Sequence, residues 1–326
     1  MSTEYLLPFQ REGLSRVETA LEEVSAGGNS QGFMVLGGAG SGKTHLMDFL
    51  AGRHPPEIMG HQRRVPCCRV AADAQASASS IAAALLVQLG IPLHVSSGWK
   101  PKQLEAALHD AIRTCGVIMV ILEELHNALL ASTNQLRGRL SLFIKNLWNL
   151  DPPDTPLNWA RPDVERRDRK LVIVASGTDE LLEVFDKRAE LKSRFSGRIR
   201  APKLAFDPPE SFKAYRGVLH AMVRRFALED HMSANDNEVA TRTLIACDGD
   251  LRVLESLLRR AATLQRRSMQ PPLELLVQAY EEVGGGVSAA SNPFRWPTAE
   301  IAARIKRARI NQRAGNGSER DEANAP

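Results

Sequence analysis

The sequence predicts an α/β protein in which a parallel sheet is sandwiched by helices and followed by a small helical lid domain. A glycine-rich segment at residues 37–44 stands between a short apolar run and a helical pattern. The aliphatic runs at 117–122 and 171–175 show no alternation, which is typical of parallel strands buried on both faces. Residues 210–282 have helical periodicity and no convincing strand, so two domains of different class are expected.

The elements of the first domain follow from local patterns. Leu14, Val17 and Leu21 share one face of the first helix. We expect strands at residues 32–36, 64–70, 117–122 and 171–175, and further helices at 44–51, 79–89, 103–114 and 136–150. Strands that alternate with helices predict a parallel sheet.

Breaks in this pattern predict the domain boundaries. The α/β domain is expected at residues 1–206, the helical lid at 207–290, and a basic segment with a disordered tail at 291–326. Asp207-Pro208-Pro209 marks the first boundary. Residues 151–170 contain four prolines and dense mixed charge, which predicts a long loop inserted between a helix and the next strand.

Composition limits the classes of protein that need considering. The 326 residues are 43% hydrophobic and 25% charged, and the net charge of +4 permits a polyanion partner without requiring one. No apolar run is long enough to span a bilayer, and the N-terminus does not resemble a signal peptide. The four cysteines contain no C-x-x-C pair. We therefore expect a cytoplasmic protein that does not associate with a membrane.

A phosphate-binding loop is predicted where the first strand meets the second helix. Its residues are Gly37, Gly38, Ala39, Gly40, Ser41, Gly42, Lys43 and Thr44, which match G-x-x-x-x-G-K-[ST] in full. The glycines let backbone N–H groups face phosphate oxygens, Lys43 would reach the β- and γ-phosphates, and the Thr44 hydroxyl would ligate Mg²⁺. The site is predicted to bind ATP with Mg²⁺, and His45 is included among its binding residues.

Two acids, Glu123 and Glu124, follow the aliphatic run at 117–122. One acid would hold the Mg²⁺ shell and the next would polarise the attacking water, both from the carboxyl end of a strand. The alternative is a solvated acid pair at a helix N-terminus. His126 follows closely, and a lone histidine is more often structural than a ligand.

Several segments together resemble AAA+ ATPases, and among them the TniB/TnsC family of transposition regulators. They are the phosphate loop, ILEELHNALL at 121–130, VASGT at 174–178, Phe9-Gln10, FIKNL at 143–147, SRF at 193–195 and NPF at 292–294. The resemblance covers most of residues 5–295. Glu123 departs from the aspartate usual in the family, which bears on the rate of hydrolysis more than on nucleotide binding. The insertion at 151–170 is also longer than the family pattern.

The resemblance implies roles for further residues. Ser176 or Thr178 would be the polar sensor that faces the γ-phosphate. Arg194 would be an arginine finger that acts in the site of a neighbouring subunit. Arg252 would be a second sensor that reaches the nucleotide from the lid. The alternative for each of these residues is an ordinary structural role, in a turn or on a helix surface.

Basic residues are the candidates for contacting DNA phosphates. Lys100 and Lys102 share a loop with a tryptophan, and Arg137 and Arg139 come next. Residues 295–313 contain six Lys or Arg and one Glu. This basic segment would bind DNA, dock a partner protein or, as a weaker option, lie on a membrane surface.

The resemblance implies an ATPase that oligomerises as a ring or helical filament on double-stranded DNA with little sequence preference. It would recruit a transposase and a target-selection protein. Two alternatives remain at this point: a AAA+ loader or nucleotide-switch defence ATPase that acts on protein partners, and a module that binds ATP with little hydrolysis.

Overall fold

The computed structural model describes residues 5–60, 62–96, 98–131, 133–150, 170–229, 232–233, 236–267, 271–284 and 291–307. Most of the predicted insertion at 151–170 and the predicted tail at 315–326 lie outside these ranges. The chain divides into two compact units. One consists of Phe9–Gly38 and Gly42–Ala201, and the other of Met1–Pro8, Ala39–Ser41 and Pro202–Pro326. Each unit is described by itself.

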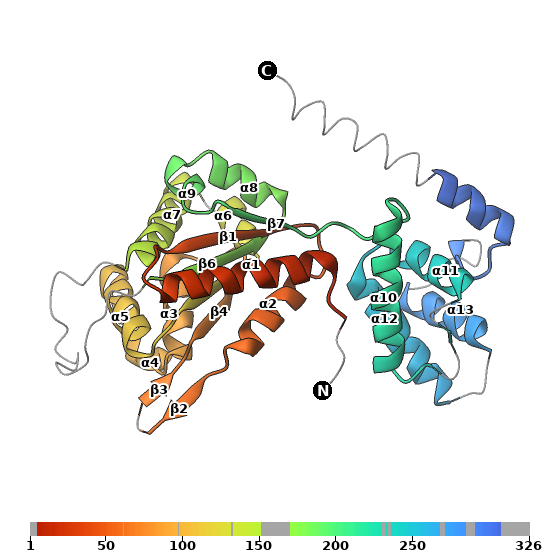
Figure 1. The fold of residues 1–326 in the computed structure, drawn as a ribbon, viewed down its shortest axis with the longest axis horizontal. Coiled ribbons are helices and arrows are strands. Elements are labelled where there is room, and N and C mark those ends of the chain that lie inside the picture. Colours follow the sequence, from red (N-terminus) through yellow and green to blue (C-terminus); the bar gives the residue numbers. More distant parts are fainter. Residues whose placement is uncertain are drawn as a thin grey trace, which may run out of the picture. The chain divides into compact units, whose positions relative to one another are not determined.

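The first unit is built on a five-stranded sheet with the order β4-β5-β6-β1-β7, in which every neighbouring pair is parallel (Figure 1). The strands are β1 (Gln31–Leu36), β4 (Cys67–Ala71), β5 (Met119–Glu123), β6 (Val172–Gly177) and β7 (Gly197–Arg200). All residues of β5 and β6 are buried. This burial explains their continuous aliphatic sequence and confirms the predicted parallel α/β architecture.

Helices of this unit cover the sheet. They are α1 (Pro8–Ser25), α2 (Lys43–Arg53), α3 (Ala78–Gln88), α4 (Leu93–Ser96), α5 (Pro101–Thr114), α6 (Leu125–Ala131), α7 (Asn134–Asn149), α8 (Asp179–Asp186) and α9 (Ala189–Lys192). One core cluster joins Met34, Val120 and Ile173 of the sheet to buried residues of α3, α5, α6, α7 and α8. Figure 1 shows α1 and α2 in front of the sheet. At Gly13 of α1, the nearest side chains are Leu46 of α2 and Ile199 of β7.

The second unit is helical. It contains α10 (Pro209–Arg225), α11 (Asn237–Cys247), α12 (Leu251–Gln265) and α13 (Pro272–Val283), and a further helical stretch covers residues 298–307. The Arg242 guanidinium of α11 is buried and donates to the carbonyls of Pro293 (2.6 Å) and Trp296 (2.9 Å). The Asn292 amide donates to the Val277 carbonyl at 3.1 Å. These bonds fix the segment that leads to the last helical stretch.

That last stretch packs by its apolar side. Ile301 is buried, and the Arg304 guanidinium lies over the Trp296 ring, 3.8 Å from its centroid. Lys306 and Arg307 are exposed. The part of the basic segment that the structure describes is therefore a folded helix with outward-facing cations.

The strand predicted at residues 64–70 begins later than expected. Residues Gln62–Arg64 form β3, which pairs antiparallel with β2 (Glu57–Met59) in a separate hairpin, and β4 begins only at Cys67. Pro66 interrupts the pattern, because it has no N–H to donate to a sheet. The hairpin and the edge strand β7 were not predicted, since short, charged segments carry almost no apolar periodicity.

No helix in the described ranges is both long enough and apolar enough to cross a bilayer. The longest helix, α1 with 18 residues, carries glutamates and arginines along its length.

All four cysteines are buried and free. Burial raises the pKa of Cys67 and of Cys68 to about 12 and that of Cys247 to about 11, and it also raises the pKa of Cys115. Because the thiolate is the reactive form, we expect the folded protein to react slowly with a disulfide reagent at pH 8. All four thiols should react once guanidinium unfolds the chain. Fast reaction of any cysteine in the folded protein would contradict this burial.

Candidate functional site

Three strands of the sheet end at the same edge, and the candidate residues follow these ends. In the strand register, Leu36 of β1 lies beside Gly177 of β6, and Leu122 of β5 lies beside Ala175. The segments that leave this edge carry the phosphate loop, the two acids and the polar residues after 175. Parallel sheets bind ligands at this carboxyl edge, so the fold brings the main predicted groups together.

The phosphate loop has the backbone geometry that its glycines permit. Gly40 has a φ of 69° and Gly42 a φ of 91°, both in the left-handed region. Gly42 is the N-cap of α2, so the N-terminal end of this helix lies at the loop. The buried Gln10 side chain of α1 donates to the Gly42 carbonyl at 2.9 Å. This bond holds the loop from outside, a role that the Phe9-Gln10 motif alone does not reveal.

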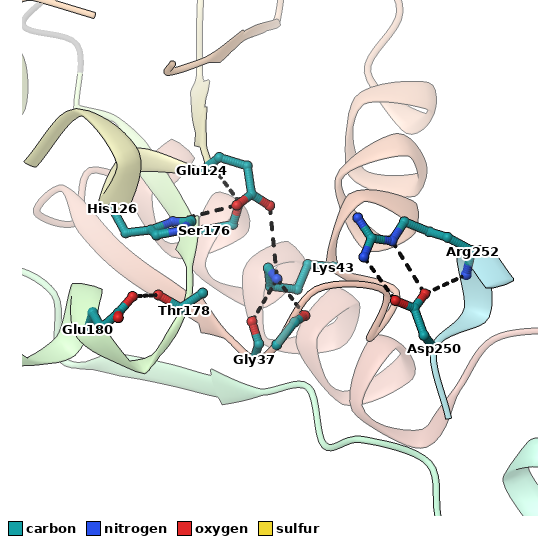
Figure 2. Close-up of polar contacts among 10 residues, drawn as sticks. Gly37, Lys43, Glu124, His126, Ser176, Thr178, Glu180, Asp250 and Arg252 are labelled. Carbon is teal, nitrogen blue, oxygen red and sulfur yellow. Dashed lines mark hydrogen bonds and ion pairs between the residues drawn. The ribbon is translucent and has the colours of Figure 1, made fainter. Parts of the chain in front are cut away.

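Lys43 lies inside the loop and is only 5% exposed. Its ammonium donates to the carbonyls of Gly37 (2.7 Å) and Gly38 (2.9 Å) and lies 3.9 Å from a Glu124 carboxylate oxygen (Figure 2). The Ser41 hydroxyl is buried and has no hydrogen-bond partner among the described residues. A buried cation at the N-terminus of a helix fits the phosphates of a nucleotide.

Glu124 is held in an unusual backbone conformation with a φ of 50°. Its N–H donates to the Ser176 hydroxyl at 3.3 Å, and its carboxylate lies 3.5 Å from Nδ1 of the buried His126. Non-glycine residues with positive φ carry strain that surrounding contacts must offset, and they cluster at functional sites. Here the turn separates the side chain of Glu124 from that of Glu123 and directs it to Lys43 (Figure 2).

Glu123, the last residue of β5, is buried and forms an ion pair with Nε of Arg69. Arg69 lies on the neighbouring strand β4 and also pairs with Asp48 of α2, at 2.5 Å. Sequence analysis did not predict a role for Arg69. The available signal was a charged residue inside the otherwise uncharged run from Val65 to Ala72. Its pairing with an acid 54 residues away emerges only from the sheet order.

The two sensor candidates are placed differently. The Ser176 hydroxyl is buried and contacts the backbone of Glu124. The Thr178 hydroxyl instead donates to the Glu180 carboxylate at 2.6 Å, where Thr178 caps the start of α8 (Figure 2). The structure therefore brings the Ser176 side chain, and not that of Thr178, against the backbone of Glu124.

Thr44 lies exposed in the first turn of α2, where its hydroxyl is free to meet a ligand beside the loop. His45 packs edge-on against Phe49, with ring centroids 4.7 Å apart. The described residues contain no cluster of three His, Cys, Asp or Glu that would hold a metal by themselves.

The two predicted arginines, Arg194 and Arg252, make other contacts than the Lys43–Glu124 pair. Arg194 follows α9, and its guanidinium donates to the Glu190 carbonyl at 2.6 Å. Arg252 belongs to the helical unit and forms an ion pair of 2.8 Å with Asp250 (Figure 2). Hydrogen bonding from Arg252 lowers the pKa of Asp250.

The predicted DNA contacts also differ in exposure. Lys100 and Lys102 are exposed at the start of α5, and Arg139 is exposed on α7. Arg137 is half-buried, and its guanidinium turns back to the Leu130 carbonyl of α6 at 3.5 Å. Positive charge is therefore exposed at Lys100, Lys102 and Arg139. Arg137 instead bonds α7 to the end of α6.

A comparison with known protein families gives a match. Residues 9–150 match the profile of the family described as bacterial TniB protein. A comparison with curated protein sequences gives no match.

Solved structures show where else this fold occurs. The Aeropyrum pernix ORC2 protein, in ADPNP–ADP complexes, is 16% identical with a TM-score of 0.60 over 92% of this chain and 72% of that chain. CDC6p from Pyrobaculum aerophilum is 14% identical with a TM-score of 0.57 over 85% of this chain and 68% of that one. The Aeropyrum pernix ORC1 protein in complex with DNA is 16% identical with a TM-score of 0.54 over 85% and 66%. At such identities the likeness shows the fold.

The fold and the matched segment point to the same kind of protein. The chain has the AAA+ P-loop fold seen in the ORC and Cdc6 proteins, and its residues 9–150, which contain the phosphate loop and both acids, match the TniB family.

Proposed function

We propose that this protein is an ATPase that regulates DNA transposition by assembling on target duplex DNA. The observation that carries the ATPase assignment is the approach of Lys43 to Glu124 at the carboxyl edge of the sheet. The TniB match over residues 9–150 supports the transposition role. The transposase and the target-selection protein that it would recruit are part of this proposal.

Each of the site residues would have a separate role in binding or hydrolysing ATP. The loop N–H groups and Lys43 would bind the phosphates, and the Thr44 hydroxyl with the Glu123 carboxylate would hold Mg²⁺, which neutralises charge on the β- and γ-oxygens. Glu124 would orient the attacking water and accept its proton. Ser176 fixes the backbone of Glu124 and with it the direction of that carboxylate.

Assembly on DNA is the second part of the proposal. One protein of similar fold, the Aeropyrum pernix ORC1 protein, has been solved in complex with DNA. In this chain Lys100, Lys102 and Arg139 offer exposed charge for phosphate contacts. The division at residues 206 and 290 into nucleotide domain, lid and basic segment stays part of the proposal.

Salt dependence tests the proposed DNA contacts. We expect ATP-dependent binding to duplex DNA that weakens steeply with salt, because Lys and Arg displace counterions from phosphates. The double variant Lys100→Ala with Lys102→Ala should weaken binding on every sequence by a similar factor. Fluorescence anisotropy with two unrelated duplexes at several salt concentrations measures both effects. A protein that binds ATP and oligomerises but ignores duplex DNA at low salt would favour the loader or defence alternative.

Deleting the basic segment separates its contribution to DNA binding from that of the loops. The cut must leave the contacts of the helical unit intact. A cut at residue 295 would remove Trp296 and Ile301, which pack in the helical unit. A cut after Arg307 leaves these contacts intact. DNA binding that survives this cut would assign the contacts to residues 1–307.

Arg194 should act in a neighbouring subunit, since its guanidinium does not join the Lys43–Glu124 cluster of its own chain. Arg194→Ala should therefore bind ATP and lose turnover. Mixing it with Lys43→Ala protein should restore part of the activity, because some interfaces then pair an intact loop with an intact finger. The ATPase rate measured against mixing ratio tests this, and no recovery at any ratio would contradict a shared site.

A second candidate function is an ATP-binding module with little hydrolysis. The observation that favours it is the Arg69–Glu123 pair, which occupies the acid expected to hold Mg²⁺. Sustained turnover of ATP by the wild-type protein with DNA present would exclude this candidate.

A further inference from the structure

Three charged side chains form a chain of contacts next to the phosphate loop. Arg69 of β4 lies between Glu123 of β5 and Asp48 of α2. Its Nε faces Glu123, and a terminal nitrogen is 2.5 Å from Asp48. The side chain of Glu123 is 8% exposed, that of Arg69 27% and that of Asp48 56%. The network therefore runs from a buried carboxylate to a solvated one.

Burial explains why Glu123 has a partner. A carboxylate removed from water needs a counter-cation and hydrogen bonds, and removing the partner of such a pair is strongly destabilising. Arg69 meets this need. Arg69 Nε holds Oε1 of this carboxylate. A divalent cation bound by Glu123 would lose that oxygen or meet the positive charge of the guanidinium beside it, so the two cations are opposed at Glu123.

The second contact of Arg69 gives the guanidinium an alternative anchor. Arginine presents its donors as a rigid fork, and here the two branches hold two different acids. If Glu123 turns to a metal ion, Asp48 still binds Arg69. The cation then remains in place without leaving a buried, unpaired charge.

We propose that Arg69 is a positioning residue that sets the Mg²⁺ affinity of the site by competing for Glu123, and that Asp48 holds Arg69 when Glu123 turns to the metal. This inference rests on the proposed nucleotide function and deepens it. Nucleotide binding without Mg²⁺ depends on the loop and Lys43, so Arg69 affects only the part of the affinity that Mg²⁺ adds.

Titration with Mg²⁺ tests the competition. A fluorescent ATP analogue reports nucleotide affinity in EDTA and at rising free Mg²⁺, and the half-saturating Mg²⁺ concentration is compared among variants. Arg69→Met should lower that concentration about tenfold, the scale of one charge-assisted hydrogen bond. Asp48→Asn should raise it about threefold, because Arg69 then pairs with Glu123 alone and a negative charge near the metal is lost.

The matched control is Arg53→Met. Arg53 lies on α2, like Asp48, but pairs with Glu18, so this variant removes a positive charge from the same helix without touching Glu123. Its half-saturating Mg²⁺ concentration should equal that of the wild type. In EDTA all four proteins should bind the analogue equally.

The opposite signs of the two effects distinguish competition from simple structural support. A structural network would make Arg69→Met and Asp48→Asn shift the Mg²⁺ dependence in the same direction, and that result would overturn the inference. If Arg69→Met fails to fold, Arg69→Lys is the second variant, because it keeps the positive charge but loses the forked guanidinium. Its half-saturating Mg²⁺ concentration should lie between that of the wild type and that expected for Arg69→Met. Together with Asp48→Asn it still decides the case.

Failure of the proposed function gives a different pattern. A wild-type protein that binds no ATP analogue with or without Mg²⁺ would overturn both proposals. A wild-type protein that binds it in a Mg²⁺-dependent way, with variants that leave the dependence unchanged, would overturn only the role of Arg69.

Discussion

Lys43→Ala should reduce ATP affinity by a factor of 100 or more. Lys43 is the charged group held within the loop, with its ammonium bonded to the Gly37 and Gly38 carbonyls and 3.9 Å from Glu124. Each hydrogen bond to a charged group contributes roughly 1.5–3 kcal/mol, and two such bonds to phosphate oxygens correspond to about two decades or more of affinity. Titration with a fluorescent ATP analogue measures the loss.

The same variant needs a check on folding, because Lys43 also bonds to the loop itself. Arg53→Met is the control for loss of one positive charge from α2, and it should bind the analogue as the wild type does. Thermal unfolding by circular dichroism shows whether the Lys43→Ala protein is folded. Unchanged affinity in a folded variant would contradict the assignment of the phosphate loop.

Glu124→Gln should slow ATP hydrolysis by about two to four orders of magnitude, the usual contribution of a general base. The amide has the same shape, so the backbone turn at φ 50° and the contact with Ser176 should persist. ATP should bind at least as tightly, because the carboxylate that attracts Lys43 has gone. Single-turnover hydrolysis together with an equilibrium binding measurement separates the two effects.

Glu123→Gln gives the contrast that assigns the two acids. This change removes the partner of Arg69 at a buried position, so we expect a loss of stability and a weaker dependence of nucleotide binding on Mg²⁺. DNA-bound assemblies of Glu124→Gln should persist after ATP is supplied. If Glu123→Gln abolished turnover while Glu124→Gln retained it, the two roles would be reversed.

Local patterns were enough to predict most of the α/β unit. The run at 117–122 is aliphatic throughout, and β5 is buried at every residue, so the burial could be inferred from the sequence. The phosphate loop could be recognised because Gly37, Gly42, Lys43 and Thr44 of its motif each meet a steric or chemical need. The hairpin of β2 and β3 was not predicted, since its strands are short and mostly polar and Ile58 in it is 83% exposed.

Contacts between distant residues account for what the sequence did not predict. Arg69 and Glu123 meet because β4 and β5 are neighbours in the sheet, and no local pattern specifies that order. The choice between Ser176 and Thr178 also required the structure. Both have a hydroxyl at the end of a strand, but Thr178 is engaged by Glu180 at the start of α8.

The left-handed turn at Glu124 has a consequence for how this chain can change. A side chain at positive φ costs on the order of 1–2 kcal/mol relative to glycine or asparagine, which adopt that region more readily. Selection for stability alone would therefore favour loss of the glutamate at this position, and such a protein would fold better and hydrolyse less. If Glu124 orients the attacking water as proposed, replacing it with glycine or asparagine should therefore raise the stability of the fold and lower the rate of hydrolysis together.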